Sequence, residues 1–220
     1  MSSPRARQEL ARIIDYVLLQ PDATRREVEA ACAEARTQGL FGLAVNSSRL
    51  VQAAHHMEGS DLKLTCVIGH PFGTADADVK RYETETAIDG GAHFIEVVAN
   101  SGQLKDGDDA GVLRDWRDLV EAADERPVSV VLDPAWLNLE EILRAVRLAL
   151  DASVKGVTIP ALHNPAATLD LAKQIHELAG DNFGLKVDGE TFETKALVQF
   201  LDAGVTRFGL TRPVALLESL

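Results

Sequence analysis

Several common functional signals are missing from this sequence of 220 residues. No apolar run approaches the roughly 20 residues that cross a bilayer, and the polar start Met1–Arg7 is unlike a signal peptide. Cysteine occurs only at Cys32 and Cys66, which we expect to be small buried residues in a reducing cytosol. We therefore expect a cytoplasmic protein with no membrane partner.

Positive charge is scarce as well. Lysine and arginine number 22 against 34 aspartates and glutamates, which gives a formal net charge of -12. Such a chain repels phosphate backbones, so no nucleic-acid partner is expected, and an anionic substrate would need a local site. No cluster has zinc-ligand spacing, no Gly-x-Ser-x-Gly elbow occurs, and no glycine-rich dinucleotide fingerprint appears. We expect neither a metal nor a cofactor.

Short apolar runs alternate with amphipathic helix patterns along the chain. The runs are rich in Val, Ile, Leu and Phe, as parallel strands covered on both faces are. The predicted strands are Ile13–Leu18, Gly42–Asn46, Lys63–Ile68, His93–Val98, Val128–Leu132, Gly156–Ile159, Phe183–Val187 and Thr206–Leu210. Eight such strand-then-helix units predict one (β/α)8 TIM barrel domain over residues 1–220. An open doubly wound sheet is the alternative.

Helix ends carry their own signals. Thr24 predicts an N-cap with Glu27 at capping-box spacing, and Gly39 predicts the end of that helix. Further helices are predicted over Asp76–Asp89, Leu139–Leu150, Pro165–Leu178 and Thr191–Asp202. In a barrel, reactive groups project from the carboxyl ends of the strands, so those ends are the place to search for a site.

Two charged residues interrupt apolar strands. Lys186 lies in a run that stops at a glycine turn, and Glu96 is flanked by Ile95 and Val97. A buried unpaired charge costs several kcal/mol, so each can balance the other. They predict an acid/base beside an amine, or else a structural ion pair that closes the core. Asp15 follows the same logic, although its segment could be a strand edge.

The chain resembles the deoxyribose-phosphate aldolase family of class I, imine-forming aldolases. The resemblance is carried in chain order by the segments Ile14–Thr24, Val67–Gly73, Ala87–Ala92, Leu104–Asp108, Phe183–Lys186 and Gly204–Gly209. It implies a (β/α)8 barrel. It also implies that Lys186 is the second active-site lysine, that Glu96 replaces the proton-relay aspartate, and that Asp15 and Asn46 match the polar residues of strands one and two.

The same resemblance fails at the imine-forming lysine. Thr158 falls at that position, and Lys155 lies near the other end of the strand, so bringing it up would need a gap inside the strand. The phosphate cradle also differs. Pro160 and Pro213 cannot donate N–H groups, Asp188 adds a negative charge, and Arg212 could compensate. Remaining substrate-binding candidates at the mouth are Asn46, Thr158, Asp133, Gly189, Thr211 and Arg212.

Three hypotheses follow for a small carbonyl or sugar-like substrate. In the first, Lys186 forms an imine, which requires a depressed pKa. In the second, Lys186 stays charged beside Glu96 and Asp15, and beside Asp133 too unless Asp133-Pro134 is a helix-capping turn. The ammonium stabilises an oxyanion or enolate while Glu96 or Asp15 acts as the base, in a lyase, isomerase or condensation reaction on a non-phosphorylated substrate. The third is a non-catalytic homologue. We expect an aldolase-like carbon–carbon lyase, and the sequence is compatible with a homo-oligomer.

Overall fold

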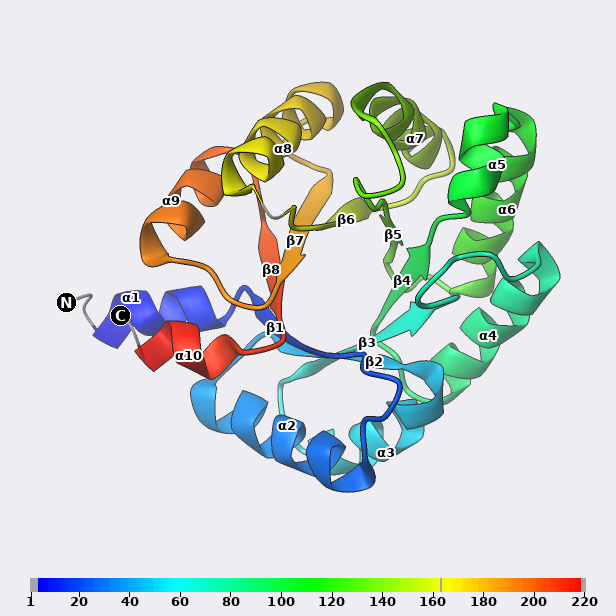
Figure 1. Ribbon diagram of the computed structural model, residues 1–220. Helices are drawn as coiled ribbons and strands as arrows, with labels where there is room; N and C mark the ends of the chain where they lie inside the picture. The colour runs from blue at the N-terminus through cyan, green and yellow to red at the C-terminus, as the bar shows by residue number, and fades with distance from the viewer. Residues whose placement is uncertain (1–3, 163, 219–220) are drawn as a thin grey trace.

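Eight parallel strands pair in chain order, and β8 returns to pair with β1, so the sheet closes on itself (Figure 1). The computed structural model describes residues 4–162 and 164–218. The strands are β1 (Ile14–Leu18), β2 (Gly42–Asn46), β3 (Lys63–Ile68), β4 (Phe94–Val98), β5 (Val128–Val131), β6 (Gly156–Pro160), β7 (Gly184–Gly189) and β8 (Arg207–Leu210). Closure confirms the predicted TIM barrel and excludes the open doubly wound sheet.

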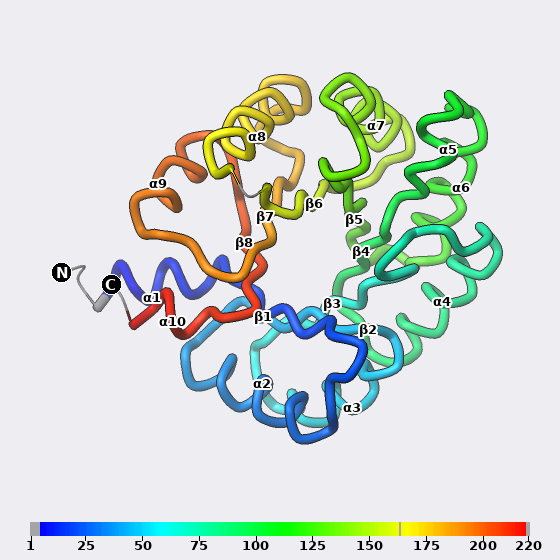
Figure 2. The backbone as a smooth tube through the Cα atoms, viewed as in Figure 1, coloured from blue at the N-terminus to red at the C-terminus, as the bar shows by residue number. Residues whose placement is uncertain are grey.

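Helices surround the barrel, as the smooth backbone trace shows (Figure 2). They are α1 (Pro4–Ala11), α2 (Arg25–Gln38), α3 (Ser47–Met57), α4 (Ala77–Asp89), α5 (Ser101–Asp106), α6 (Asp109–Ala122), α7 (Leu139–Asp151), α8 (Pro165–Ala179), α9 (Thr194–Asp202) and α10 (Pro213–Glu218). The described helices include none that is long and apolar enough to cross a membrane. Cys32 and Cys66 are buried and unpaired, as predicted.

Local sequence signals explain where the helices start and stop. Thr24 caps α2 and exchanges hydrogen bonds with Glu27, which confirms the predicted capping box. Gly39 ends the same helix with φ of 67°, a left-handed conformation that glycine adopts without steric cost. Asn138 and Glu141 form a second capping box at the start of α7. These caps fix the residues at which α2 begins and ends and at which α7 begins.

The strand register arranges the barrel interior in layers of side chains from alternate strands. One layer contains Asp15, Thr65, Ser129 and Lys186, and the next layer towards the carboxyl ends contains Ala44, Glu96, Thr158 and Gly209. Above these polar groups, Val17, Val67 and Val98 form an apolar cluster with Ala44, and Val131 packs against it. Above the two polar layers, the interior is therefore apolar on the side of β1–β5.

Candidate active site

Lys186 is the centre of the interior polar cluster. Its side chain rises from β7, only 6% exposed, and its Nζ lies 2.7 Å from Glu96 Oε1 on β4. The same Nζ lies 3.7 Å from Asp15 Oδ2 on β1 and 3.3 Å from Asp188 Oδ1 on its own strand. The structure thus brings the three predicted catalytic residues together. Lys186 points into the barrel and not towards bulk water.

Arg207 supplies a second cation that sequence reasoning missed. Its Nη2 donates a 2.8 Å hydrogen bond to Asp15 Oδ2 and lies 4.0 Å from Glu96 Oε1. Its guanidinium stacks over the rings of Phe41 and Phe94, at 4.3 and 4.8 Å from their centroids. Cation–π contact of this kind holds the charge in place at low solvent exposure. Lys186 is therefore not a solitary cation among acids.

Asp188 is a third carboxylate beside Lys186, a contact that the sequence analysis does not foresee. The sequence predicts Asp188 as a negative charge at the phosphate position, and in the structure its side chain also turns inward to pair with Lys186. Glycine at Gly209 makes the space, because a Cβ there would collide with Asp188 Oδ1 and lie 2.8 Å from Lys186 Cε. With 21% of its side chain exposed, Asp188 is the acid of the cluster nearest to solvent.

The pKa values of the cluster follow from its charges. Burial works against the ammonium of Lys186, but Asp188, Glu96 and Asp15 outweigh it and raise the pKa of Lys186 above its ordinary value. Burial raises the pKa of Asp188 to about 6, against the opposing pull of Lys186. Lys186 is thus an ammonium at neutral pH, and Asp188 titrates within reach of it.

Thr158 lies beside Lys186 in the β6–β7 register. Its hydroxyl is buried and has no hydrogen-bond partner among the described residues. A hydroxyl beside the Lys186 ammonium can donate to a substrate oxygen bound next to that ammonium. The position of Thr158 is compatible with its predicted substrate-binding role, which stays a prediction. Lys155 precedes β6 and is exposed, at the end of the strand remote from the site.

The remaining candidates lie in the loops at the carboxyl ends of the strands. Asn46 Nδ2 donates to the Leu19 carbonyl at 3.1 Å, and Thr211 N donates to the Gly189 carbonyl at 3.1 Å. Arg212 is exposed and forms an ion pair with Glu190 at 3.0 Å, so a carboxylate partly neutralises its charge. The Asn46 contact joins the ends of β1 and β2, and the contacts of Thr211 and Arg212 join the ends of β7 and β8.

The sequence leaves two possibilities open for Asp133, a further carboxylate facing Lys186 or a residue of a capping turn. Its Oδ1 instead accepts a 2.8 Å hydrogen bond from Ala135 N, which makes it a turn residue. Among the described ion pairs, none joins Asp133 to Lys186, and Asp188 occupies the third carboxylate position. Short polar side chains bond to the backbone two residues on, and an Asp-Pro sequence favours that outcome.

Arg207 and Asp188 could have been found from strand alternation. Phe208 and Leu210 are buried apolar residues of β8, so Arg207 and Gly209 must face the opposite side, into the barrel. The same argument pairs Asp188 with Lys186 on one face of β7. Arg207 is inconspicuous in the sequence because it lies in the family-like segment Gly204–Gly209, and Asp188 because the predicted strand ends at Val187.

Comparison with known proteins places the chain in a family. No family model matches it. A deoxyribose-phosphate aldolase of Aciduliprofundum boonei is 33% identical over 216 residues, covering 97% of both chains. The chain belongs to the deoxyribose-phosphate aldolase family. A deoxyribose-phosphate aldolase of Geobacillus sp. is 34% identical over 211 residues, 95% of each chain.

A solved structure supports the same assignment to the deoxyribose-phosphate aldolase family. The deoxyribose phosphate aldolase of Aeropyrum pernix superposes with a TM-score of 0.84 at 25% identity, covering 96% of this chain and 91% of that one. The chain is accordingly an aldolase-like lyase. The assignment of Thr158 to the position of the imine-forming lysine of deoxyribose-phosphate aldolases stays a prediction.

Proposed function

We propose that this chain catalyses aldol-type cleavage or formation of a carbon–carbon bond in a small, non-phosphorylated carbonyl or sugar-like substrate, with Lys186 acting as a cation. The observation that carries the proposal is the set of three carboxylates within 4.0 Å of one buried Nζ. An amine so surrounded holds its proton, and an ammonium cannot add to a carbonyl. It can, however, stabilise the enolate that forms as the bond breaks.

Proton transfer falls to the acids around Lys186. Glu96 is bound to the ammonium at 2.7 Å and, as carboxylate, can take the proton of the substrate hydroxyl whose carbon–carbon bond cleaves. Cleavage then leaves an aldehyde and an enolate. The enolate takes a proton at carbon, and Asp188 is the acid placed towards solvent to supply it. Thr158 would donate its free hydroxyl to the substrate oxygen.

A preference for substrates without phosphate is proposed from the charges at the mouth of the barrel. Asp188 lies where an anionic group would approach, and Pro160 and Pro213 remove two backbone donors. Arg212, the cation nearest in sequence, is paired with Glu190. We therefore expect 2-deoxyribose to be a better substrate than its 5-phosphate, measured as the ratio of kcat/KM.

Substitution of Lys186 tests the cationic role. Lys186→Met is expected to lower kcat by about 100-fold to 1000-fold, the usual effect of removing one oxyanion-stabilising group. Borohydride reduction of wild-type protein with acetaldehyde is expected to leave no adduct on Lys186. Lys155→Met, an exposed lysine outside the barrel, is the matched control and should keep full activity.

Two results would contradict this role. A reduced adduct on Lys186 would show that its amine reacts as a nucleophile. Activity retained in Lys186→Met but abolished in Glu96→Gln would show that no cation is needed. Tight binding of aldehydes or sugars without turnover in a broad substrate screen would favour a non-catalytic homologue.

Self-association is proposed on separate grounds. The related protein of Aeropyrum pernix is described as tetrameric. In this chain, Phe72, Val79 and Tyr82 are exposed apolar side chains on or next to α4, which suits an interface between copies. We expect light scattering to give a mass that is a multiple of 23.8 kDa. A concentration-independent monomer would contradict this proposal.

A further inference from the structure

A second buried lysine lies outside the barrel interior. Lys80, on α4, is 6% exposed, and its Nζ donates a 3.1 Å hydrogen bond to the Val98 carbonyl at the end of β4. Its aliphatic chain packs against Gly69, where a Cβ would lie 3.2 Å from Lys80 Cε. The side chain is thus held in one orientation, with one acceptor for three N–H groups.

The surroundings of Lys80 differ from those of Lys186 in one decisive respect. Among the described residues, no carboxylate lies within 4.0 Å of Lys80 Nζ. Glu83, one turn on, is already engaged by Ser47 Oγ at 2.7 Å and Gly69 N at 2.9 Å. Burial therefore lowers the pKa of Lys80, and the more distant Asp115 and Glu83 only partly offset it.

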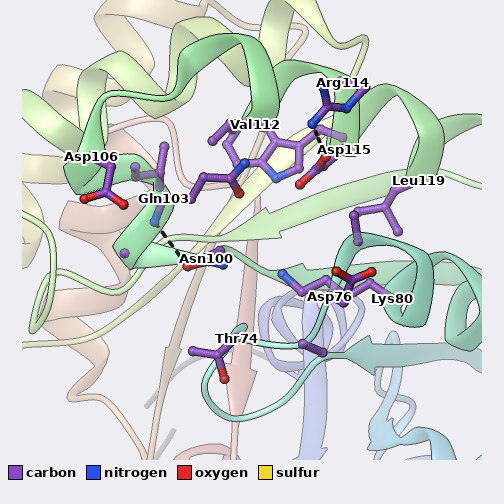
Figure 3. A pocket seen from close by; sticks show the side chains of 15 residues that line it. Thr74, Asp76, Lys80, Asn100, Gln103, Asp106, Val112, Arg114, Asp115 and Leu119 are labelled. Atoms are coloured by element: carbon purple, nitrogen blue, oxygen red, sulfur yellow. Dashed lines mark hydrogen bonds and ion pairs between the residues drawn. The ribbon is translucent and has the colours of Figure 1, made fainter.

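Lys80 also borders open space. It lines a pocket of about 580 Å³ between the loops after β3 and β4 and helix α6 (Figure 3). Asp115 and Arg114 contribute from α6, and Asn100 and Gln103 contribute amide groups. The volume lies within the range of small-molecule sites. Polar groups of both charges suit a compact, uncharged hydroxy-aldehyde better than an anion.

We propose that Lys80 and this pocket form a second site, at which the Lys80 amine condenses with small aldehydes to give an imine. The site is separate from the Lys186 cluster and requires no change to the function proposed for it. A buried amine that lacks a carboxylate partner and faces a cavity meets the requirements for a nucleophilic lysine.

The covalent step needs only the amine, the aldehyde and a proton acceptor. Lys80 first gives its extra proton to solvent. The nitrogen lone pair then forms a bond to the carbonyl carbon, the carbon–oxygen π bond breaks, and one N–H proton passes through solvent to the oxygen, which yields a neutral carbinolamine. The hydroxyl takes up the proton that Lys80 released to solvent and leaves as water while the nitrogen lone pair forms the carbon–nitrogen double bond. The remaining N–H proton then passes to Asp115. Asp115 suits this task, because burial raises the pKa of its carboxyl.

Reductive trapping on the intact protein tests the site. Acetaldehyde is added at neutral pH with cyanoborohydride, which reduces an imine to an ethylamine, and peptide mapping measures the rate at each lysine. We expect Lys80 to be modified measurably faster than the exposed Lys173, because burial lowers the pKa of Lys80 and leaves more of its amine neutral. Asp115→Asn should slow modification at Lys80 and leave Lys173 unchanged.

Matched variants separate this site from the others. Lys80→Arg keeps the positive charge and should abolish trapping at position 80, whereas Lys173→Arg should leave the Lys80 rate unchanged. Equal rates at Lys80 and Lys173 in wild-type protein, or no modification of Lys80, would overturn the proposal, whether or not the variants fold. An adduct on Lys186 would instead contradict the proposed function, so the two failures are distinguishable.

Discussion

Thr158 and Lys186 pair across β6 and β7, and their side chains set the charge of the site. A hydroxyl beside the ammonium does not repel it, whereas three carboxylates attract it. A second amine at position 158 would have the opposite effect, because neighbouring ammonium groups lower each other's pKa. We therefore propose that the identity of residue 158 decides whether Lys186 acts as a cation or as a nucleophile.

Thr158→Lys should change the chemistry accordingly. Repulsion between the two amines favours a neutral one, so we expect a borohydride-trapped adduct with acetaldehyde at position 158 or 186. Mass spectrometry of the digested protein measures it. Thr158→Met, a side chain of similar length without an amine, is the control and should give no adduct at either position. Equal adduct levels in both variants would refute the argument.

Asp188 gives the site a pH dependence that can be measured in stability. Its pKa is raised from 3.8 to about 6, so the folded state binds the proton more tightly than the unfolded state. Its contribution to stability is therefore largest at low pH and falls as pH rises from about 4 to about 6. Between those two pH values, the contribution of Asp188 to the free energy of unfolding changes by up to about 3 kcal/mol.

Asp188→Asn keeps the shape of the protonated side chain and removes the titration. Across that pH interval, the free energy of unfolding of wild-type protein should fall relative to that of the variant. Denaturant unfolding followed by circular dichroism at several pH values measures both. Parallel pH profiles for the two proteins, or a relative gain for wild type, would contradict the expected sign.

The sequence predicted part of the site because charge in an apolar strand is conspicuous. Lys186, Glu96 and Asp15 stood out for that reason, and all three meet in the barrel. Arg207 and Asp188 lie at strand ends, where charged residues are common and only the direction of the side chain reveals a role. That direction depends on where each strand begins and ends, the feature that sequence locates least well.

At the scale of elements, α2 offers a clean test of helix capping. Thr24 Oγ1 accepts a hydrogen bond from Glu27 N, so Thr24→Ala leaves a helix N–H without its partner. We expect a loss of about 1 kcal/mol in the free energy of unfolding. Thr37→Ala, on the exposed side of the same helix, is the control and should be neutral or slightly stabilising.

Unfolding by urea distinguishes these outcomes. A Thr24→Ala midpoint equal to that of wild type would show that the capping box contributes no net stability. A similar loss in both variants would show that the effect comes from the helix interior and not from its end.

The positions of strands were predictable where an apolar run and the residues that bound it indicated the same ends. β2 and β3 match the predicted ranges, because their apolar runs are bounded by turn or polar residues. β7 extends two residues further than predicted, to Gly189, because Asp188 pairs with Pro160 and Gly209 on the neighbouring strands. Such pairing is a tertiary effect, and a polar Asp-Gly sequence read alone predicts a turn.

At the scale of the whole molecule, the barrel concentrates its few interior charges at one place. Three carboxylates and two cations meet near the centre, and the chain as a whole carries a net charge of -12. Surface acids repel anions over distances of about one Debye length, whereas the central cluster acts only on a molecule already inside. Under the proposed function, discrimination against anionic substrates therefore begins before any contact with Lys186.

The valine cluster on the β1–β5 side has a stereochemical consequence. An acceptor aldehyde lying against Val17, Val67 and Val98 has one face of its carbonyl carbon covered by hydrocarbon and the other turned towards Lys186 and Asp188, where the proposed enolate binds. A new bond can then form only on the uncovered face. Chiral chromatography of the addition product should accordingly show one enantiomer in large excess. A racemic product would mean that the bound molecule presents either of its two faces to the reacting partner inside the barrel.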